Sequence, residues 1–246
     1  MANQPVVSQA SVLRKRTLGG RVKKTSRYRA VEEQGFSLIE VILAITVGLI
    51  LTGVAIPKVT TLVRSYRSYG DARSLSEEVS MAKMRGPADF TVARVYADLS
   101  TNRYRVEAWV IPPNGTSKCW VTDGDTQCSA NYSSPNTPPS TLLLTTVTFG
   151  YGGLSSAPSG TQSTLAQAPA CQTDAQTTAG TVGNVANSAC VVFNSRGIPV
   201  DNTGAPTASD ALYVTDSSSA YGVTVLATGL IQTWRATLPS GSWFNR

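Results

Sequence analysis

The sequence predicts an α+β protein, with one long N-terminal helix packed on a head of antiparallel β-strands. Three observations predict this fold: an almost wholly apolar stretch, then apolar residues at helical spacing, then short runs that alternate apolar and polar residues. The chain of 246 residues is long enough to bury a core of its own. We expect four parts, namely a leader at 1–35, a transmembrane segment at 36–57, an amphipathic continuation of the same helix at 58–86 and a β-rich head at 87–246.

The net positive charge of the chain lies at its N-terminus. Residues 1–35 contain eight Lys or Arg and two Glu, which account for the whole formal charge of +6. From Phe36 onward, 13 basic and 13 acidic residues cancel. The first segment has too few apolar residues to form a core, so we interpret it as a disordered cytoplasmic leader. The high pI therefore indicates a targeting signal, and no nucleic-acid partner is expected.

The apolar stretch Phe36–Ile56 contains 21 residues, with Glu40 as its only charge. As a helix it would be about 31 Å long, which is enough to cross a bilayer. Basic residues precede it, which predicts a cytoplasmic N-terminus and an exported head. An exported enzyme or binding module on a conventional signal is an alternative. A signal-anchor would tolerate Glu40 near the interface, and Gly53-Val54-Ala55 offers a small-x-small cleavage site.

Two apolar stripes at helical spacing follow Pro57, and Gly86-Pro87 is expected to end the helix. The first stripe contains Val59, Leu62, Val63 and Tyr66, and the second contains Ala72, Leu75, Val79 and Ala82. The predicted strands are Phe90–Asp98, Arg103–Ile111, Lys118–Thr122, Leu142–Phe149, Ala189–Phe193, Ala211–Val214, Tyr221–Ala227 and Leu230–Arg235, with a hairpin turn at 99–102. Between Ser129 and Ser188 the chain is rich in Ser, Thr and Pro, and we expect a long loop around one strand.

The residue types argue against catalysis. The chain contains no histidine, so His-based triads and His metal sites are excluded, and we expect neither an enzyme nor a cofactor. Asp123-Gly124-Asp125 offers too few oxygens for calcium and is interpreted as a tight turn. The four cysteines lack metal-like spacing and follow the membrane segment, which favours two disulfides. Three pairings are open, and joining sequence neighbours predicts Cys119–Cys128 and Cys171–Cys190.

The run Gly35-Phe36-Ser37-Leu38-Ile39-Glu40, with the basic leader before it and Pro57 22 positions after Gly35, resembles the class III signal of type IV prepilins and type II secretion pseudopilins. The resemblance implies that a prepilin peptidase cuts between Gly35 and Phe36 and methylates the new amino group of Phe36. It also implies that Glu40 pairs with the N-terminal amine of a neighbouring subunit. Pro57 would kink or loosen the helix, because it lacks an amide hydrogen.

Short patches in the rest of the chain resemble the GspH/FimT class of minor pilins and pseudopilins. They are Met81–Arg85 leading into the first strand, Val191–Gly197, and the closing strands Tyr221–Ala227 and Thr228–Ile231. The resemblance implies a minor pilin or pseudopilin in the bacterial inner membrane, with a periplasmic head, that assembles with other pilin or pseudopilin subunits into a pilus or pseudopilus.

A DNA-uptake pilin is the alternative function within this class. Some members bind DNA through arginines just after the C-terminal glycine turn, but here Arg235 is the only basic residue of the strand that follows Gly229. Arg94, Arg103 and Arg105 alternate along the first two strands with Asp98 and Glu107 among them, which we interpret as a solvated sheet face and not as a DNA surface.

Overall fold

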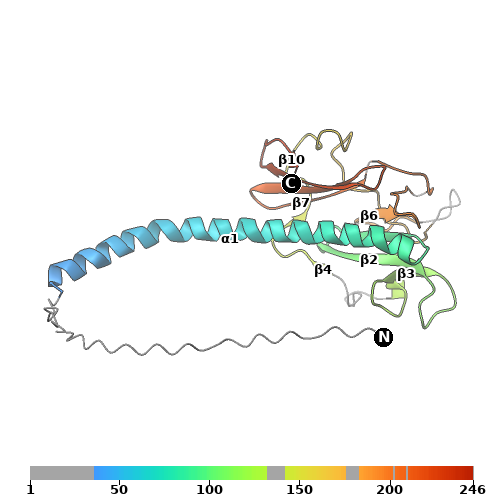
Figure 1. Cartoon of the computed structure of the whole chain (residues 1–246), viewed down its shortest axis with the longest axis horizontal. Helices are drawn as coiled ribbons and strands as arrows, with labels where there is room; N and C mark the ends of the chain where they lie inside the picture. The colour runs from blue at the N-terminus through green and yellow to red at the C-terminus, as the bar shows by residue number, and fades with distance from the viewer. Residues whose placement is uncertain (1–35, 132–141, 176–182, 202, 209, 246) are drawn as a thin grey trace, which may run out of the picture. The chain divides into compact units, whose positions relative to one another are not determined.

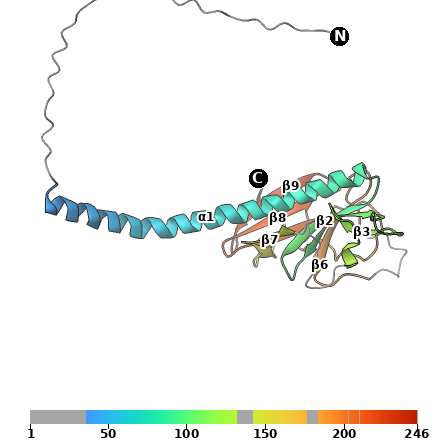
Figure 2. The same ribbon diagram turned by 90° about the horizontal axis from the view of Figure 1, so that it is seen from below.

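The computed structural model describes residues 36–131, 142–175, 183–201, 203–208 and 210–245. The chain divides into two compact units, 1–51 and 52–246. One helix, α1 (Leu38–Ala88), begins in the first unit and continues into the second, where it meets the β-strands (Figures 1 and 2). The α+β fold predicted from the sequence is therefore confirmed.

Within the first unit, the apolar side chains of α1 are exposed. Leu43, Leu49 and Ile50 keep between 61% and 69% of their surface accessible. Among the described residues, α1 is the one helix long and apolar enough to span a membrane. Exposure of so many apolar residues in one segment fits a lipid environment.

Within the second unit, Ser68 is the first buried residue of α1. The second predicted stripe, Ala72 to Ala82, is buried, whereas Val59 and Tyr66 of the first stripe are 55% and 68% exposed. The helix ends at Ala88, not at Gly86 as predicted. Pro87 fits into the last turn, which is closed by hydrogen bonds from the Asp89 amide to the Arg85 carbonyl and from the Thr91 amide to the Gly86 carbonyl.

The strands form two antiparallel sheets. The first has the order β3-β2-β1-β6, with β4 also paired to β2, and the second has the order β10-β9-β8-β7-β5. The members of the first sheet are β1 (Ala93–Asp98), β2 (Arg103–Val110), β3 (Cys119–Thr122), β4 (Leu142–Leu143) and β6 (Ser188–Phe193). The members of the second sheet are β5 (Thr148–Phe149), β7 (Asp210–Thr215), β8 (Ser219–Val225), β9 (Ile231–Thr237) and β10 (Phe244–Asn245). A short 3-10 turn, η1 (Ser129–Asn131), follows β3.

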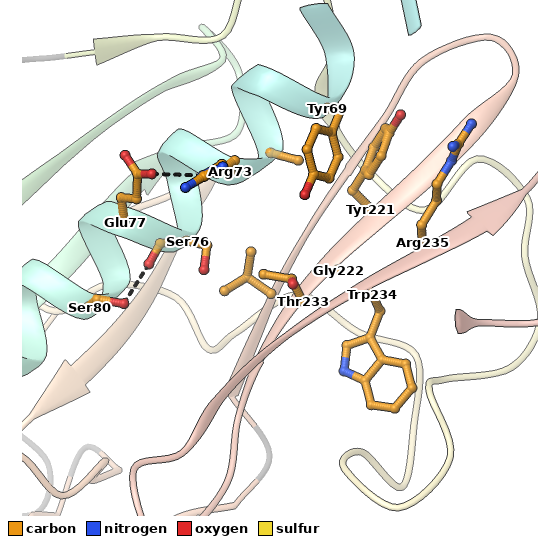
Figure 3. A pocket seen from close by; sticks show the side chains of 12 residues that line it. Tyr69, Arg73, Ser76, Glu77, Ser80, Tyr221, Gly222, Thr233, Trp234 and Arg235 are labelled. Atoms are coloured by element: carbon orange, nitrogen blue, oxygen red, sulfur yellow. Dashed lines mark hydrogen bonds and ion pairs between the residues drawn. The ribbon is translucent and has the colours of Figure 1, made fainter. Parts of the chain in front are cut away.

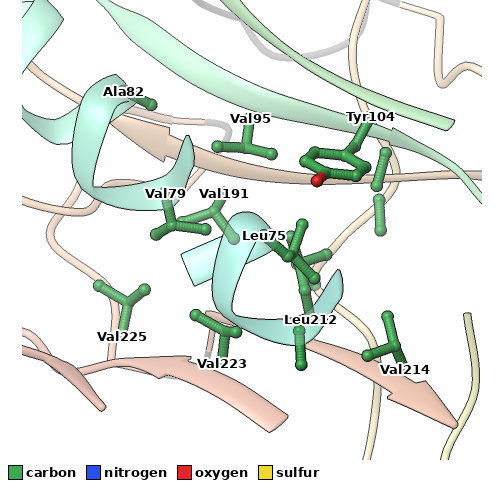
Figure 4. Packing of buried hydrophobic residues seen from close by; sticks show 14 of the residues in the cluster. Leu75, Val79, Ala82, Val95, Tyr104, Val191, Leu212, Val214, Val223 and Val225 are labelled. Carbon is green, nitrogen blue, oxygen red and sulfur yellow. The ribbon is translucent and has the colours of Figure 1, made fainter. Parts of the chain in front are cut away.

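The C-terminal half of α1 lies between the two sheets. Figure 4 shows Leu75 and Val79 of the helix with Val95 and Val191 of the first sheet on one side and Val223 of the second sheet on the other. These five side chains are at most 2% exposed, so they remove apolar surface from water almost completely. One continuous core therefore joins the helix to both sheets.

The prediction of one continuous strand at Leu142–Phe149 is wrong. The segment forms two short strands in different sheets, since β4 pairs with β2 and β5 pairs with β7. Between them the Asp71 carboxylate of α1 accepts hydrogen bonds from the Thr145 amide at 3.1 Å and the Thr146 amide at 2.8 Å. The segment therefore crosses from one sheet to the other while it is fixed to the helix.

Candidate processing and assembly site

Ser37 forms the N-cap of α1. Its carbonyl accepts hydrogen bonds from the Glu40 amide at 2.9 Å and the Val41 amide at 3.2 Å. Serine is a preferred residue at this position, and Glu40 lies three residues later, in the first turn. Ser37-x-x-Glu40 has the spacing of a capping box, and a carboxylate here interacts favourably with the helix dipole. The Ser-x-x-Glu spacing is a signal that the sequence itself contains, and it places Glu40 in the first turn of the helix.

The residues expected at the processing site lie at the very start of the described chain. Phe36 is 81% exposed, and Glu40 is also exposed, without an ion-pair partner among the described residues. Gly35, and with it the bond predicted to be cut, lies outside the described residues. The first unit thus presents an apolar residue and an unpaired carboxylate one turn apart, which suits contacts to another chain.

Pro57 lies within α1, and the helix is not interrupted there. The hydroxyl groups of Thr60 and Thr61 both donate to the Pro57 carbonyl at 2.9 Å. Proline cannot donate the hydrogen bond that would normally reach the carbonyl of Gly53, so the helix is weakened at this turn even where it stays continuous. The two hydroxyl groups bind the Pro57 carbonyl and not the Gly53 carbonyl, so they do not replace the missing hydrogen bond, and such side-chain bonds tend to bend helices.

Residues 32–56 match the family model described as the prokaryotic N-terminal methylation motif. The chain carries this motif. Its first residues fall in the basic leader and its last residue directly precedes Pro57, so the motif includes Phe36 and Glu40. The motif marks a type IV prepilin-like substrate of prepilin peptidase and fits a membrane-anchored helix. Neither the comparison with curated proteins nor the comparison with solved structures finds a match.

Beyond the motif, the patches that resemble GspH/FimT proteins lie together in the head. Gly197 and Gly229 have left-handed φ angles of 71° and 77°. A Cβ atom on Gly229 would lie 2.7 Å from the Gly197 carbonyl oxygen and 3.3 Å from Cε of Lys83. The two glycine turns therefore contact each other and the last turns of α1, and neither position tolerates a side chain easily.

A groove of about 260 Å³ lies between α1 and strands β8 and β9 (Figure 3). The exposed Arg73–Glu77 ion pair, with 3.1 Å between Nε and Oε1, lies on its helical side. The rings of Tyr69 and Tyr221 are 6.5 Å apart, and burial raises the pKa of the Tyr221 phenol. Aromatic, hydroxyl and charged side chains line the groove, which suits contact with another molecule.

The two disulfides join Cys119 to Cys128 and Cys171 to Cys190, the same pairs that the sequence analysis predicts. Asp123, which follows β3, forms an ion pair with Arg85 of α1 at 3.0 Å. The Asp125 amide donates to the Thr122 carbonyl at 2.9 Å, and Gly124 adopts a left-handed φ of 79°. The segment 123–125 is therefore a tight turn joined to the end of the helix, as interpreted from the sequence.

The interpretation of Arg94, Arg105 and Glu107 as a solvated face is wrong. Arg94 is 4% exposed and Glu107 is completely buried. Nη2 of Arg94 lies 2.6 Å and Nε of Arg105 2.7 Å from the carboxylate of Glu107. Burial alone would raise the pKa of Glu107, but the two guanidinium groups and their hydrogen bonds hold it below its usual range. All three groups are therefore charged inside the protein.

Proposed function

We propose that this protein is a minor pilin or pseudopilin, a structural subunit that a prepilin peptidase processes and that assembles with other pilin-like subunits in the inner membrane. The observation that carries the proposal is the methylation motif at 32–56 on a helix whose apolar residues are exposed. An exposed apolar helix needs lipid or neighbouring helices. The role is structural and not catalytic, which the absence of histidine from the sequence supports.

Within this family, we infer membership of the GspH/FimT class. The patches that resemble the class meet around the contact of Gly229 with Gly197 and Lys83, where an extra Cβ has no room. Three short sequence matches that form one packed junction support the inference better than three scattered matches would. The orientation with a cytoplasmic N-terminus and a periplasmic head rests on the basic residues that precede the helix.

Mass spectrometry of the mature protein from cells with a prepilin peptidase tests the proposal. We expect a chain that begins with N-methylated Phe36, and Gly35→Leu should leave the precursor uncut, because a large side chain replaces glycine beside the cleaved bond. A substitution deep in the leader, such as Arg14→Lys, serves as the matched control and should be processed normally. A mature chain that starts near Ile56, or one that keeps its leader, would contradict the proposal and favour a conventional signal-anchor.

A further inference from the structure

A second cavity, of about 320 Å³, lies on the face of the first sheet that points away from α1. Strand alternation places Val95 and Val106 on the core side and Arg94, Tyr96, Arg105 and Glu107 on this outer side. The cavity is lined by residues of β1, β2 and β3 and by two loops, and its charged residues are Arg94, Arg105 and Glu107. Neither the methylation motif nor the assembly role accounts for it.

Each disulfide holds one of the two loops over the sheet. In the Cys119–Cys128 disulfide, Cys128 directly precedes Ser129 and Ala130, which line the cavity. In the Cys171–Cys190 disulfide, Cys171 directly precedes Gln172. The carbonyl of Gln172 accepts a hydrogen bond from Nη1 of Arg94 at 2.6 Å. The cavity is therefore bordered by two covalently restrained segments, and Arg94 also holds the segment of Gln172 in place.

The cavity contains one positive charge in excess. Arg94 and Arg105 share the single carboxylate of Glu107, and all three side chains are at most 13% exposed. Tyr96 and Trp120 surround the cations, since the Arg94 guanidinium lies 3.8 Å from the Trp120 ring centroid and the Arg105 guanidinium lies 4.0 Å from that of Tyr96. These contacts fix the guanidinium planes and keep water from most of their faces, so the excess charge is poorly solvated.

Two sets of hydrogen-bond donors at the cavity have no acceptor. Of the three guanidinium nitrogens of Arg105, Nε alone has an acceptor among the described residues, the Glu107 carboxylate at 2.7 Å. Nη1 and Nη2 therefore remain available. Trp120 is 95% buried, and its Nε1 lacks an acceptor in the described part of the chain. An oxygen of a bound ligand would supply an acceptor for these donors.

We propose that this cavity binds a carboxylate, with the Nη1 and Nη2 edge of Arg105 as its main contact. The two coplanar oxygens of a carboxylate match the planar guanidinium fork. Its single negative charge balances the single excess positive charge. A phosphate brings about −1.5 to −2 charges close to Glu107, so it fits the site less well. The carboxylate belongs either to a free small acid or to an acidic side chain of another subunit.

Titration of the full-length protein in detergent micelles tests this site through the four tryptophan indole N–H resonances, with Trp120 assigned by Trp120→Phe. The probes are acetate, N-acetyl-aspartyl-N-methylamide and inorganic phosphate, each at constant ionic strength set with chloride. We expect a saturable shift of the Trp120 resonance with the carboxylates. Tighter binding of the aspartyl compound would indicate a protein side chain as the source, whereas equal or tighter binding of acetate would indicate a free acid.

Arg105→Lys keeps the charge but removes the fork, and we expect it to weaken carboxylate binding by about tenfold or more. Arg103→Lys is the matched control, because it makes the same change on the same strand outside the cavity, and it should bind as the wild type does. No saturable shift, an equal response to chloride alone, tighter binding of phosphate, or an unchanged affinity in Arg105→Lys would each overturn the proposal.

Discussion

Glu40 lies in the first turn of α1, where its interaction with the helix dipole stabilises the helix by about 0.3–1 kcal/mol. Placing a carboxylate at the centre of a membrane helix costs about 2.5–3.5 kcal/mol on insertion scales, and the cost is lower near the helix end, where Glu40 lies. The local interaction offsets only part of the full penalty. A cation from a neighbouring subunit would supply the missing stabilisation, which supports the pairing of Glu40 with an N-terminal amine.

Replacement of Glu40 tests this pairing. Glu40→Ala should be inserted and cleaved as well as the wild type, because the unpaired charge is gone, but it should be lost from complexes with other pilin-like subunits. Glu40→Asp withdraws the carboxylate by one methylene and should be partly defective. Co-purification with partner subunits measures the effect, with N-terminal analysis as the check on processing. If Glu40→Ala assembles normally, the pairing mechanism does not operate in this protein.

Asp210 is a buried carboxyl group at the start of β7. It is 3% exposed, and its carboxylate has no hydrogen-bond partner among the described residues. Burial, together with the charge of Asp201, raises its pKa to about 7. Asp201 itself accepts hydrogen bonds from the Thr203 amide, the Thr203 hydroxyl and the Ala205 amide, which lower its pKa. Asp201 therefore stays charged while Asp210 resists ionisation.

The raised pKa of Asp210 predicts how stability depends on pH. Because the folded pKa lies above the unfolded value, ionisation of this group destabilises the fold progressively from about pH 4 to pH 7 and by a constant amount above that. Asp210→Asn should raise the free energy of unfolding by about 2–4 kcal/mol above pH 7 and by little near pH 4. Denaturant unfolding followed by tryptophan fluorescence measures this, with exposed Asp174→Asn as the control. A gain that is independent of pH would refute the assignment.

At the scale of elements, the sequence predicts what local periodicity determines. The buried helix stripe with Leu75 and Val79, the hairpin of β1 and β2, and the spacing from Phe36 to Glu40 are all readable from neighbouring residues. The division of 142–149 into two strands is not readable from neighbouring residues. Asp71, more than 70 residues earlier, fixes the point at which the segment passes from one sheet to the other. A run of apolar and β-branched residues looks like a single strand when such a distant partner is unknown.

The cavity on the first sheet illustrates the same limit. Alternation along β2 correctly separates Arg105 and Glu107 from Val106. Alternation cannot show that disulfide-closed loops cover the polar side, so it predicts a solvated face where the protein has a buried ion cluster. The chemistry of the processing motif depends on local sequence, whereas that of the cavity depends on loops brought together from distant parts of the chain.

The contact of α1 with the turns at Gly197 and Gly229 yields a prediction about the free energy of unfolding. Gly229→Ala adds both left-handed strain and a Cβ atom 2.7 Å from the Gly197 carbonyl oxygen. Gly153→Ala is the matched control, since Gly153 has a φ of 81° but no atom near the added Cβ. We expect losses of about 1 kcal/mol for Gly153→Ala and about 2–4 kcal/mol for Gly229→Ala in unfolding free energy. Equal losses would show that the junction relaxes freely.

At the scale of the whole molecule, charge distribution argues against nucleic-acid binding once the leader is removed. The chain from Phe36 onward has no net charge, and two of its arginines, Arg94 and Arg105, are engaged with Glu107 inside the protein. Long-range attraction of phosphate requires an excess of exposed positive charge.

The processed protein should therefore not bind duplex DNA at physiological salt in a gel-shift assay. The unprocessed precursor is a useful comparison, since its basic leader should bind DNA weakly and lose this binding as salt rises. Micromolar or tighter binding by the processed chain would favour the DNA-uptake alternative.

The two disulfides also link the outer cavity to the redox conditions around the head. Thiols stay reduced in the cytoplasm, and the segments that carry Ser129 and Gln172 have no covalent closure there. Export of the head, which is part of our proposal, would allow oxidation to close both loops beside Arg94 and Arg105. Newly made protein would thus pass through the cytoplasm without a formed cavity, and it would acquire the cavity only in the compartment where its head works. Oxidation in the periplasm would act as a maturation step. A subunit that fails to reach this compartment would then not retain a carboxylate.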